Sequence, residues 1–247
     1  MNDDRLDGIT TRWSLVRRAH MKGDAASAAE ARSILVMRYA SAIRRYIGGI
    51  LKDCDETDEV AQDVIVRLLK GDFAGADPDR GRFRDLLKTA VRNMVRNHWT
   101  KKNQRRAVSD PDFDQIADAD EATPESAWMS AWKANLLDHV WAELQDMERK
   151  NPKNPAYTVL KWRTDYPEES SDQLAVRLSE KLGSPVRPDA ARQMLRRARV
   201  RFAELLIEEI SMGLDGASQQ EIEDELAAVG LLELVRDYLP KESEPEA

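Results

Sequence analysis

The strongest amphipathic pattern in the chain lies at residues 83–99, which read FRDLLKTAVRNMVRNHW. Apolar side chains recur there every three or four residues, the spacing that places them on one face of an α-helix. The apolar face holds Phe83, Leu86, Leu87, Ala90, Val91, Met94, Val95 and then His98 or Trp99. We therefore predict a helix at about 82–99 that packs on a core with this face.

The polar face of the same helix carries Lys88, Arg92 and Arg96 at four-residue steps, with Asn93 and Asn97 beside them. Spaced cations with amides and a terminal aromatic side chain suit a phosphate backbone and unstacked bases. A surface helix whose charged face is merely solvated explains the same pattern. Both interpretations stay open from this pattern alone.

Most of the remaining chain also has helical periodicity, and we find no sustained two-residue alternation of the kind that indicates strands. Loops are predicted where Gly, Asp, Asn and Pro cluster, at 71–78 and 151–155. Helices are predicted at about 11–22, 25–51, from 55 onward, 172–182, from 189 onward and 219–238. We expect an all-α fold of two helical domains joined by an acidic linker, with segments 1–106, 107–125 (linker), 126–212 and 213–247 (extension).

The composition excludes several classes of protein. The single Cys54 rules out a disulfide framework or a Cys-rich zinc module, and three widely spaced histidines argue against a His-based metal centre. No Gly-rich phosphate loop or Ser-His-Asp set is present, so we expect neither an enzyme nor a cofactor. No aliphatic run can span a bilayer, and the acidic N-terminus is not a secretory signal. We expect a cytoplasmic protein with no membrane partner.

The formal net charge of −7 conceals blocks of opposite sign. Residues 1–106 hold 22 basic and 15 acidic side chains, and residues 169–206 hold 8 and 5. The intervening 107–168 hold 6 basic and 13 acidic side chains, and 207–247 hold 2 and 12. Attraction to DNA depends on local positive potential and counterion release, so the two basic blocks remain candidate polyanion-binding regions.

The second basic block has the pattern of a helix-turn-helix. Ser170 and Gln173 predict a capping box, Gly183 suits a helix C-terminus, and Pro188 suits the first turn of the next helix. On that next helix the inward positions are Ala191, Leu195, Ala198 and Phe202. The outward positions are Asp189, Gln193, Arg196 and Arg197, with Arg192 and Arg199 on the flank. Such a helix can offer Arg and Gln to a major groove, although a basic helical hairpin packed on other helices fits too.

Acidic residues gather at the start of the helix predicted from 55. They are Asp53, Asp55, Glu56, Asp58, Glu59 and Asp63. Acids here stabilise the helix macrodipole, which is one explanation. No His or loop geometry supports a metal site, and no pocket partner indicates catalytic carboxylates. An exposed acidic face that contacts a basic partner protein is a further possibility.

The order of these segments resembles a bacterial RNA polymerase sigma factor of the extracytoplasmic-function group. Three runs carry the resemblance: ETDEVAQD at 56–63, FRDLLKTAVRN at 83–93 and RQMLRRAR at 192–199. The resemblance covers roughly residues 11–210. It implies two helical domains, no covalent chemistry, and core RNA polymerase and promoter DNA as partners, with an anti-sigma factor or other regulatory protein as a possible further partner.

The resemblance also implies roles for individual residues. Docking on the clamp helices of the largest polymerase subunit would fall to Glu56, Asp58, Glu59, Gln62 and Asp63. The loop at 71–82 would open the minus-ten element, and its single strand would be held by Lys88, Arg92, Asn93 and Arg96. The minus-thirty-five duplex would be read by Asp189, Arg192, Gln193, Arg196 and Arg197. The acidic linker would thread the RNA channels of the polymerase.

Residues 213–247 have no counterpart in the minimal architecture of that family. They form an acidic segment with an apolar side, expected to be a helix at 219–238. One hypothesis is that it folds back on the basic faces or core helices and restrains DNA binding until a partner displaces it. The other is that it packs on the last domain and aids solubility.

Two other functions stay open on the sequence alone. One is a stand-alone helix-turn-helix regulator that binds duplex DNA without polymerase. The other is a helical adaptor whose basic faces bind acidic proteins.

Overall fold

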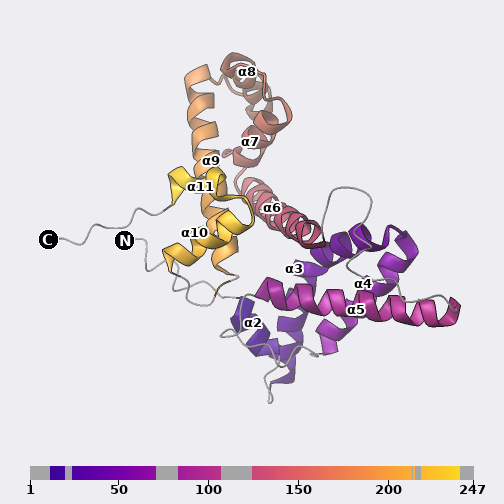
Figure 1. Cartoon of the computed structure of the whole chain (residues 1–247). Coiled ribbons are helices and arrows are strands. Elements are labelled where there is room, and N and C mark those ends of the chain that lie inside the picture. The colour runs from indigo at the N-terminus through magenta and orange to yellow at the C-terminus, as the bar shows by residue number, and fades with distance from the viewer. Residues whose placement is uncertain are drawn as a thin grey trace. The chain divides into compact units, whose positions relative to one another are not determined.

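Figure 1 shows the computed structural model of the chain, which describes residues 12–19, 24–70, 83–106, 124–212, 214 and 218–239. Every regular element in these residues is a helix, which confirms the all-α prediction. No helix among them is long and apolar enough to cross a membrane. The loop predicted at 71–82 and linker residues 107–123 lie outside the described residues.

The chain forms two compact units. The N-terminal unit consists of Met1–Asn135 with Ile210–Gly230, and the C-terminal unit consists of Leu136–Glu209 with Leu231–Ala247. Residues 124–135 and 210–230 thus belong with the N-terminal unit, although they lie on the far side of the acidic linker in the sequence.

The N-terminal unit is built on α3 (Ala25–Leu51), which contacts α2 (Arg12–Ala19), α4 (Cys54–Lys70) and α5 (Phe83–Arg106). Helix α3 has the predicted bounds. Helix α5 continues two turns past the predicted end at Trp99, because the following residues are mostly Lys, Gln and Arg, which favour helix. The apolar face predicted for α5 is largely buried, with Leu87, Val91 and Val95 each at most 1% exposed.

The turn between α3 and α4 has an explicit local cause. Lys52 adopts φ 55° and donates its backbone N–H to the carbonyl oxygen of Gly48, which ends α3. Asp53 then caps α4, because its carboxylate accepts the N–H of Glu56 and its carbonyl accepts the hydroxyl of Thr57. A Cβ at Gly48 would lie 3.5 Å from the Thr57 methyl group, which is an ordinary van der Waals contact, so an alanine would fit between the two helices.

Aromatic side chains fasten the first part of α6 (Pro124–Lys150) to α3. Tyr39 stacks on Trp132 at a centroid distance of 5.4 Å, and Tyr46 meets Trp128 edge-on at 5.1 Å. The two tryptophans also contact each other at 5.7 Å. All four rings are at most 2% exposed, so this cluster is the centre of the N-terminal core.

The C-terminal unit contains the remainder of α6, α7 (Ala156–Asp165), α8 (Ser171–Leu182) and most of α9 (Pro188–Ser211). It also contains α11 (Leu232–Val235) and the 3-10 helix η2 (Arg236–Tyr238). The predicted capping box is present: Gln173 N–H donates to Ser170 Oγ, and Ser170 N–H donates to Gln173 Oε1. Gly183 ends α8 with φ 64°, also as predicted.

A buried carboxylate connects three helices of this unit. Glu148 of α6 accepts the backbone N–H of Thr158 at 2.8 Å and its hydroxyl at 2.6 Å, which satisfies donors in the first turn of α7. Lys181 of α8 lies 3.0 Å from the same carboxylate. The ring of Trp141 on α6 contacts the rings of Tyr157 on α7 and Phe202 on α9.

The prediction of a single helix at 219–238 is wrong, because the structure divides this segment. Helix α10 (Gln219–Ala228) begins with a capping box between Ser218 and Glu221 and ends four residues before α11. Gly230 adopts φ 67°, a left-handed conformation that interrupts the helix. Apolar periodicity continues through this glycine, which is why the sequence pattern suggested one helix.

We predict that Trp132→Ala lowers the free energy of unfolding of the N-terminal unit by about 3–5 kcal/mol, because it removes a buried stacked ring and leaves a cavity. Urea denaturation followed by far-ultraviolet circular dichroism measures the change. Met37→Ala is the matched control on α3, since that side chain is 80% exposed. The control should stay within about 0.5 kcal/mol of the wild type; equal effects from both substitutions would contradict the central role of the cluster.

Candidate functional site

The acidic residues predicted for docking lie mostly on the outer face of α4. Asp58, Glu59, Gln62 and Asp63 are exposed. The apolar side of the helix, including Val60, Val64 and Leu68, is buried. The structure therefore brings these four side chains together on one accessible surface, which we call the α4 acidic face.

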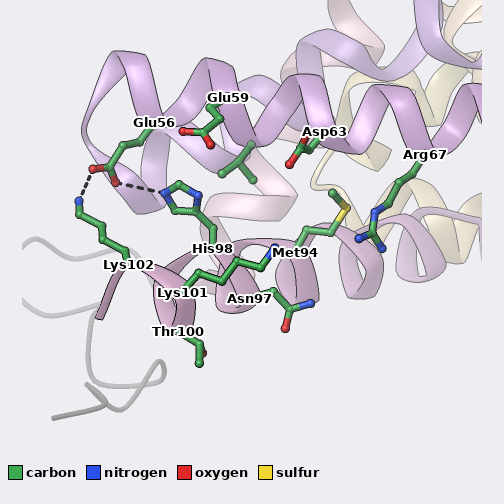
Figure 2. Close-up of a pocket in the computed structure, with 11 residues that line it drawn as sticks. Glu56, Glu59, Asp63, Arg67, Met94, Asn97, His98, Thr100, Lys101 and Lys102 are labelled. Carbon is green, nitrogen blue, oxygen red and sulfur yellow. Dashed lines mark hydrogen bonds and ion pairs between the residues drawn. The ribbon is translucent and has the colours of Figure 1, made fainter. Parts of the chain in front are cut away.

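Glu56 differs from the rest of the predicted docking set. Its carboxylate forms an ion pair with Lys102 near the C-terminal end of α5, and His98 Nε2 lies 3.6 Å from the same group (Figure 2). Its side chain is 23% exposed. The family resemblance of the run at 56–63 placed Glu56 among the docking residues. The structure shows that Glu56 also holds α4 and α5 together.

A pocket of about 660 Å³ lies between α4 and α5 next to this ion pair. Figure 2 shows Glu59 and Asp63 on one wall and Asn97 and Lys101 on the other. Val60 and Met94 supply apolar lining. Opposite charges thus face each other across the pocket, so it is not a uniformly basic or acidic site. No group of His, Cys, Asp and Glu among the described residues could hold a metal ion.

Asp58 is held by a cation from α3. Arg44 donates from Nε to Oδ1 of Asp58 at 2.6 Å and from Nη2 to Oδ2 at 3.3 Å. The hydrogen bond from Arg44 holds the pKa of Asp58 below its ordinary value and raises the pKa of Arg44. The stabilisation from this pair is present above the ordinary Asp pKa of about 3.9 and is lost as pH falls through the lowered value. Asp58 is therefore fully charged at neutral pH.

The cations predicted for single-stranded DNA follow one row along α5. Arg96 and Asn93 are exposed, whereas Lys88 and Arg92 are half-buried. Lys88 Nζ lies 3.9 Å from Asp85. Exposure along the row thus increases from Lys88 and Arg92 to Arg96, while Leu87 and Val91 of the same helix are buried.

Sequence reasoning missed the residue that precedes this row. Arg84 is buried, with 7% of its surface exposed, and its Nη1 lies 2.5 Å from Oε1 of Glu225 on α10. The four-residue step from Arg84 to Lys88 was a signal that Arg84 belongs to the row. No local pattern pairs it with a carboxylate 141 residues away.

The proposed duplex-reading residues share an exposed face of α9. Asp189, Arg192, Gln193, Arg196 and Arg197 are all exposed. The inward positions are buried as predicted: Ala191, Leu195, Ala198 and Phe202 are between 0% and 7% exposed. The turn before α9 is fixed by the N–H of Val186, which donates to Ser179 Oγ at 2.8 Å. Asp189 forms an ion pair with Arg192, so the first turn of α9 presents both charges together.

Comparison with protein families finds one match, to Sigma-70 region 2, over residues 35–106. The match begins within α3 and runs through α4 and α5, and it therefore contains the α4 acidic face and the cationic row. No curated protein and no solved structure matches the chain. Sigma-70 region 2 is a domain of transcription initiation factors that takes part in RNA polymerase binding and promoter melting, so residues 35–106 support a sigma factor.

Proposed function

We propose that this protein is a sigma factor of the extracytoplasmic-function type. It binds core RNA polymerase, recognises minus-thirty-five and minus-ten elements and helps to open the promoter. The observation that carries the proposal is the Sigma-70 region 2 match at 35–106, which begins within α3 and includes α4 and α5. Within that match the acidic and cationic surfaces lie on different helices, as two different partners require.

The α4 acidic face supplies the polymerase-docking surface. Its exposed carboxylates at 58, 59 and 63 are attached to a helix whose other side is buried, so their positions are defined before binding. Such a surface attracts a basic partner at long range and selects its orientation on contact. Glu56 contributes indirectly by fixing α4 against α5 through Lys102.

The cationic row on α5 holds the opened strand. Lys88, Arg92 and Arg96 contact phosphates, while Asn93 is placed to contact a base edge. The protein performs no covalent chemistry in this proposal. Strand opening is driven by binding energy gained when unstacked bases and their phosphates meet a preformed surface.

Helix α9 reads duplex DNA in the major groove. Arg196 and Arg197 offer planar guanidinium groups suited to guanine, and Gln193 offers an amide suited to adenine. The tight turn from Gly183 to Pro188 and the buried inner face of α9 are features that helix-turn-helix docking uses.

Two other functions compete with this proposal. A stand-alone helix-turn-helix regulator would use α9 but has no need of a Sigma-70 region 2 segment. A helical adaptor that binds acidic proteins would use the basic faces without sequence preference for DNA.

The deciding experiment is transcription in vitro with added bacterial core polymerase on a library of random-sequence duplex templates. Transcripts that start at a shared motif support the sigma factor, and template binding without polymerase-dependent transcripts supports the regulator.

We predict that Asp58→Lys weakens binding to core polymerase at least about tenfold, mainly through a slower association rate, because a cation replaces an anion on the α4 acidic face. Surface plasmon resonance at two salt concentrations measures both quantities. Arg44→Gln is the matched control, since it breaks the same ion pair but leaves the Asp58 carboxylate in place.

Arg44→Gln should keep or increase polymerase affinity. It should also return the pKa of Asp58 toward the ordinary Asp value, as carbon-detected NMR titration would show. If Arg44→Gln weakens binding as much as Asp58→Lys, the ion pair and not the acidic face is what the polymerase requires.

We predict that Arg196→Ala lowers affinity for a duplex promoter, found by the transcription assay, by roughly tenfold and relaxes base preference at one position. Fluorescence anisotropy with the promoter and single-base variants measures this. Lys150→Ala is the control, because Lys150 is an exposed cation of the same unit that pairs with Asp146 outside α9. A loss of affinity that is identical for the two variants would mean that α9 makes no specific contact.

A further inference from the structure

The C-terminal extension contributes a helix to the N-terminal unit. Helix α10 lies in that unit together with α5 and the first part of α6. Its Glu225 pairs with Arg84 of α5, and the carbonyl of Gly230 just after it accepts a hydrogen bond from Lys133 of α6 at 2.9 Å. Upstream, Arg38 of α3 donates to the sulfur of Met212 at 3.6 Å. Helices α5 and α6 of the N-terminal unit therefore hold the extension directly, and α3 contacts the residue just before it.

The pair between Arg84 and Glu225 is the most enclosed of these contacts. The two side chains are 8% and 7% exposed and are 2.5 Å apart. Desolvating two charges opposes most of the attraction between them, so such a pair adds little net stability. It does favour this position of α10, because a shift that kept the helix packed on α5 but separated the two groups would leave a buried charge without its partner. Three apolar residues close to Glu225 in the sequence are also buried: Ile222, Leu226 and Val229. They give this segment an apolar inner side.

Arg84 occupies the first position of the cationic row. It precedes Lys88, Arg92 and Arg96 at the same four-residue step. Each step of four turns the helix by about 40°, so Arg84 and Lys88 are neighbours on the surface of α5. Glu225 therefore neutralises the end of the row, whereas Arg96 at the other end is exposed.

We propose that Glu225 occupies Arg84 in the place of a DNA phosphate, so that α10 and the single strand compete for the start of the cationic row. This rests on the proposed function of α5. A single hydrogen bond, from Nη1 of Arg84 to Oε1 of Glu225, joins the two groups. A guanidinium group makes charge-assisted hydrogen bonds of this kind to carboxylates and to phosphates, so one anion can replace the other. Arg84 is then a strand-binding residue that is masked in the free protein.

The rest of α10 strengthens the competition. The helix contains Glu221, Glu223, Asp224 and Glu225 and no basic residue. Glu221 and Asp224 are exposed, so the docked helix brings negative charge to the unit that carries the row. A polyanion is repelled while α10 is in place, and the positive potential of α5 rises when α10 leaves.

The test compares Glu225→Ala with Asp224→Ala in the full-length protein. Both variants lose one negative charge from the same helix, but the described contact of Asp224 is only with Gln220. The probe is a fluorescein-labelled, mixed-sequence single-stranded DNA of about 20 nucleotides, titrated over a series of NaCl concentrations. Glu225→Ala should bind about threefold or more tightly than Asp224→Ala at physiological salt, and its salt slope should steepen by about 0.7, because one more phosphate is neutralised.

The double variant Arg84→Ala/Glu225→Ala should lose this gain. Equal affinities for the two single variants, or a gain that survives in the double variant, would overturn the proposal. Glu225→Ala leaves a buried arginine unpaired and can destabilise the unit, so the wild type supplies a second measurement. Saturating single-stranded DNA should increase hydrogen exchange of the amides of α10, and unchanged exchange would also overturn the proposal.

The outcome separates this proposal from the proposed function. If the wild type directs transcription by core polymerase but Glu225→Ala behaves as Asp224→Ala, only the masking of Arg84 is wrong. If the wild type neither binds core polymerase nor directs transcription, the sigma-factor function is wrong and the competition with promoter DNA is wrong with it.

Discussion

The packing of Trp128 and Trp132 against Tyr46 and Tyr39 is the constraint on which the N-terminal unit depends. Because α6 is fastened to α3, both ends of the acidic segment at 107–123 are attached to the same unit, at the end of α5 and the start of α6. The chain passes from one unit to the other within α6. In the proposed function, an acidic segment that threads a polymerase channel would leave this unit and return to it, and α6 would lead to the unit that contains α9.

The distribution of charged side chains explains how a chain of net charge −7 could bind a polyanion. The α4 acidic face and the cationic row lie on separate helices, and opposite charges are paired where α4 and α5 meet, as in Glu56 with Lys102. These pairs are partly exposed, so each contributes little stability. Their consequence is geometric: Glu56 keeps α5 beside α4, and Arg44 keeps the Asp58 carboxylate on the outer side of α4. In the proposed function, the charges that remain exposed would contact different partners.

Features with a local cause were predictable from the sequence. The capping box at Ser170, the left-handed Gly183 and the inner face of α9 all follow from patterns within a few residues. Features that depend on distant partners were not predictable. In the sequence, Glu56 is one of several acidic residues at the start of a helix. Its contact with Lys102 forms only because α4 and α5 lie close together in space. Gly230 shows the converse: apolar periodicity continued through it, but its backbone conformation ended the helix. Periodicity reports which side of a segment is apolar and does not report whether the backbone is continuous.

The pair between Arg84 and Glu225 shows why the remaining information is absent from the sequence. An arginine at the start of an amphipathic helix is ordinarily exposed, and a glutamate in an acidic tail is ordinarily solvated. Each becomes buried only because the other is present, so neither position is informative alone. Removing one partner of such a pair costs about 3–5 kcal/mol, although the intact pair adds little. Because of that difference in free energy, the pair can distinguish two arrangements, one with α10 docked and one with α10 displaced. With α10 in place the two charges pair with each other, and with α10 displaced Arg84 becomes accessible to another anion, which in the proposal above is a strand phosphate beside Lys88.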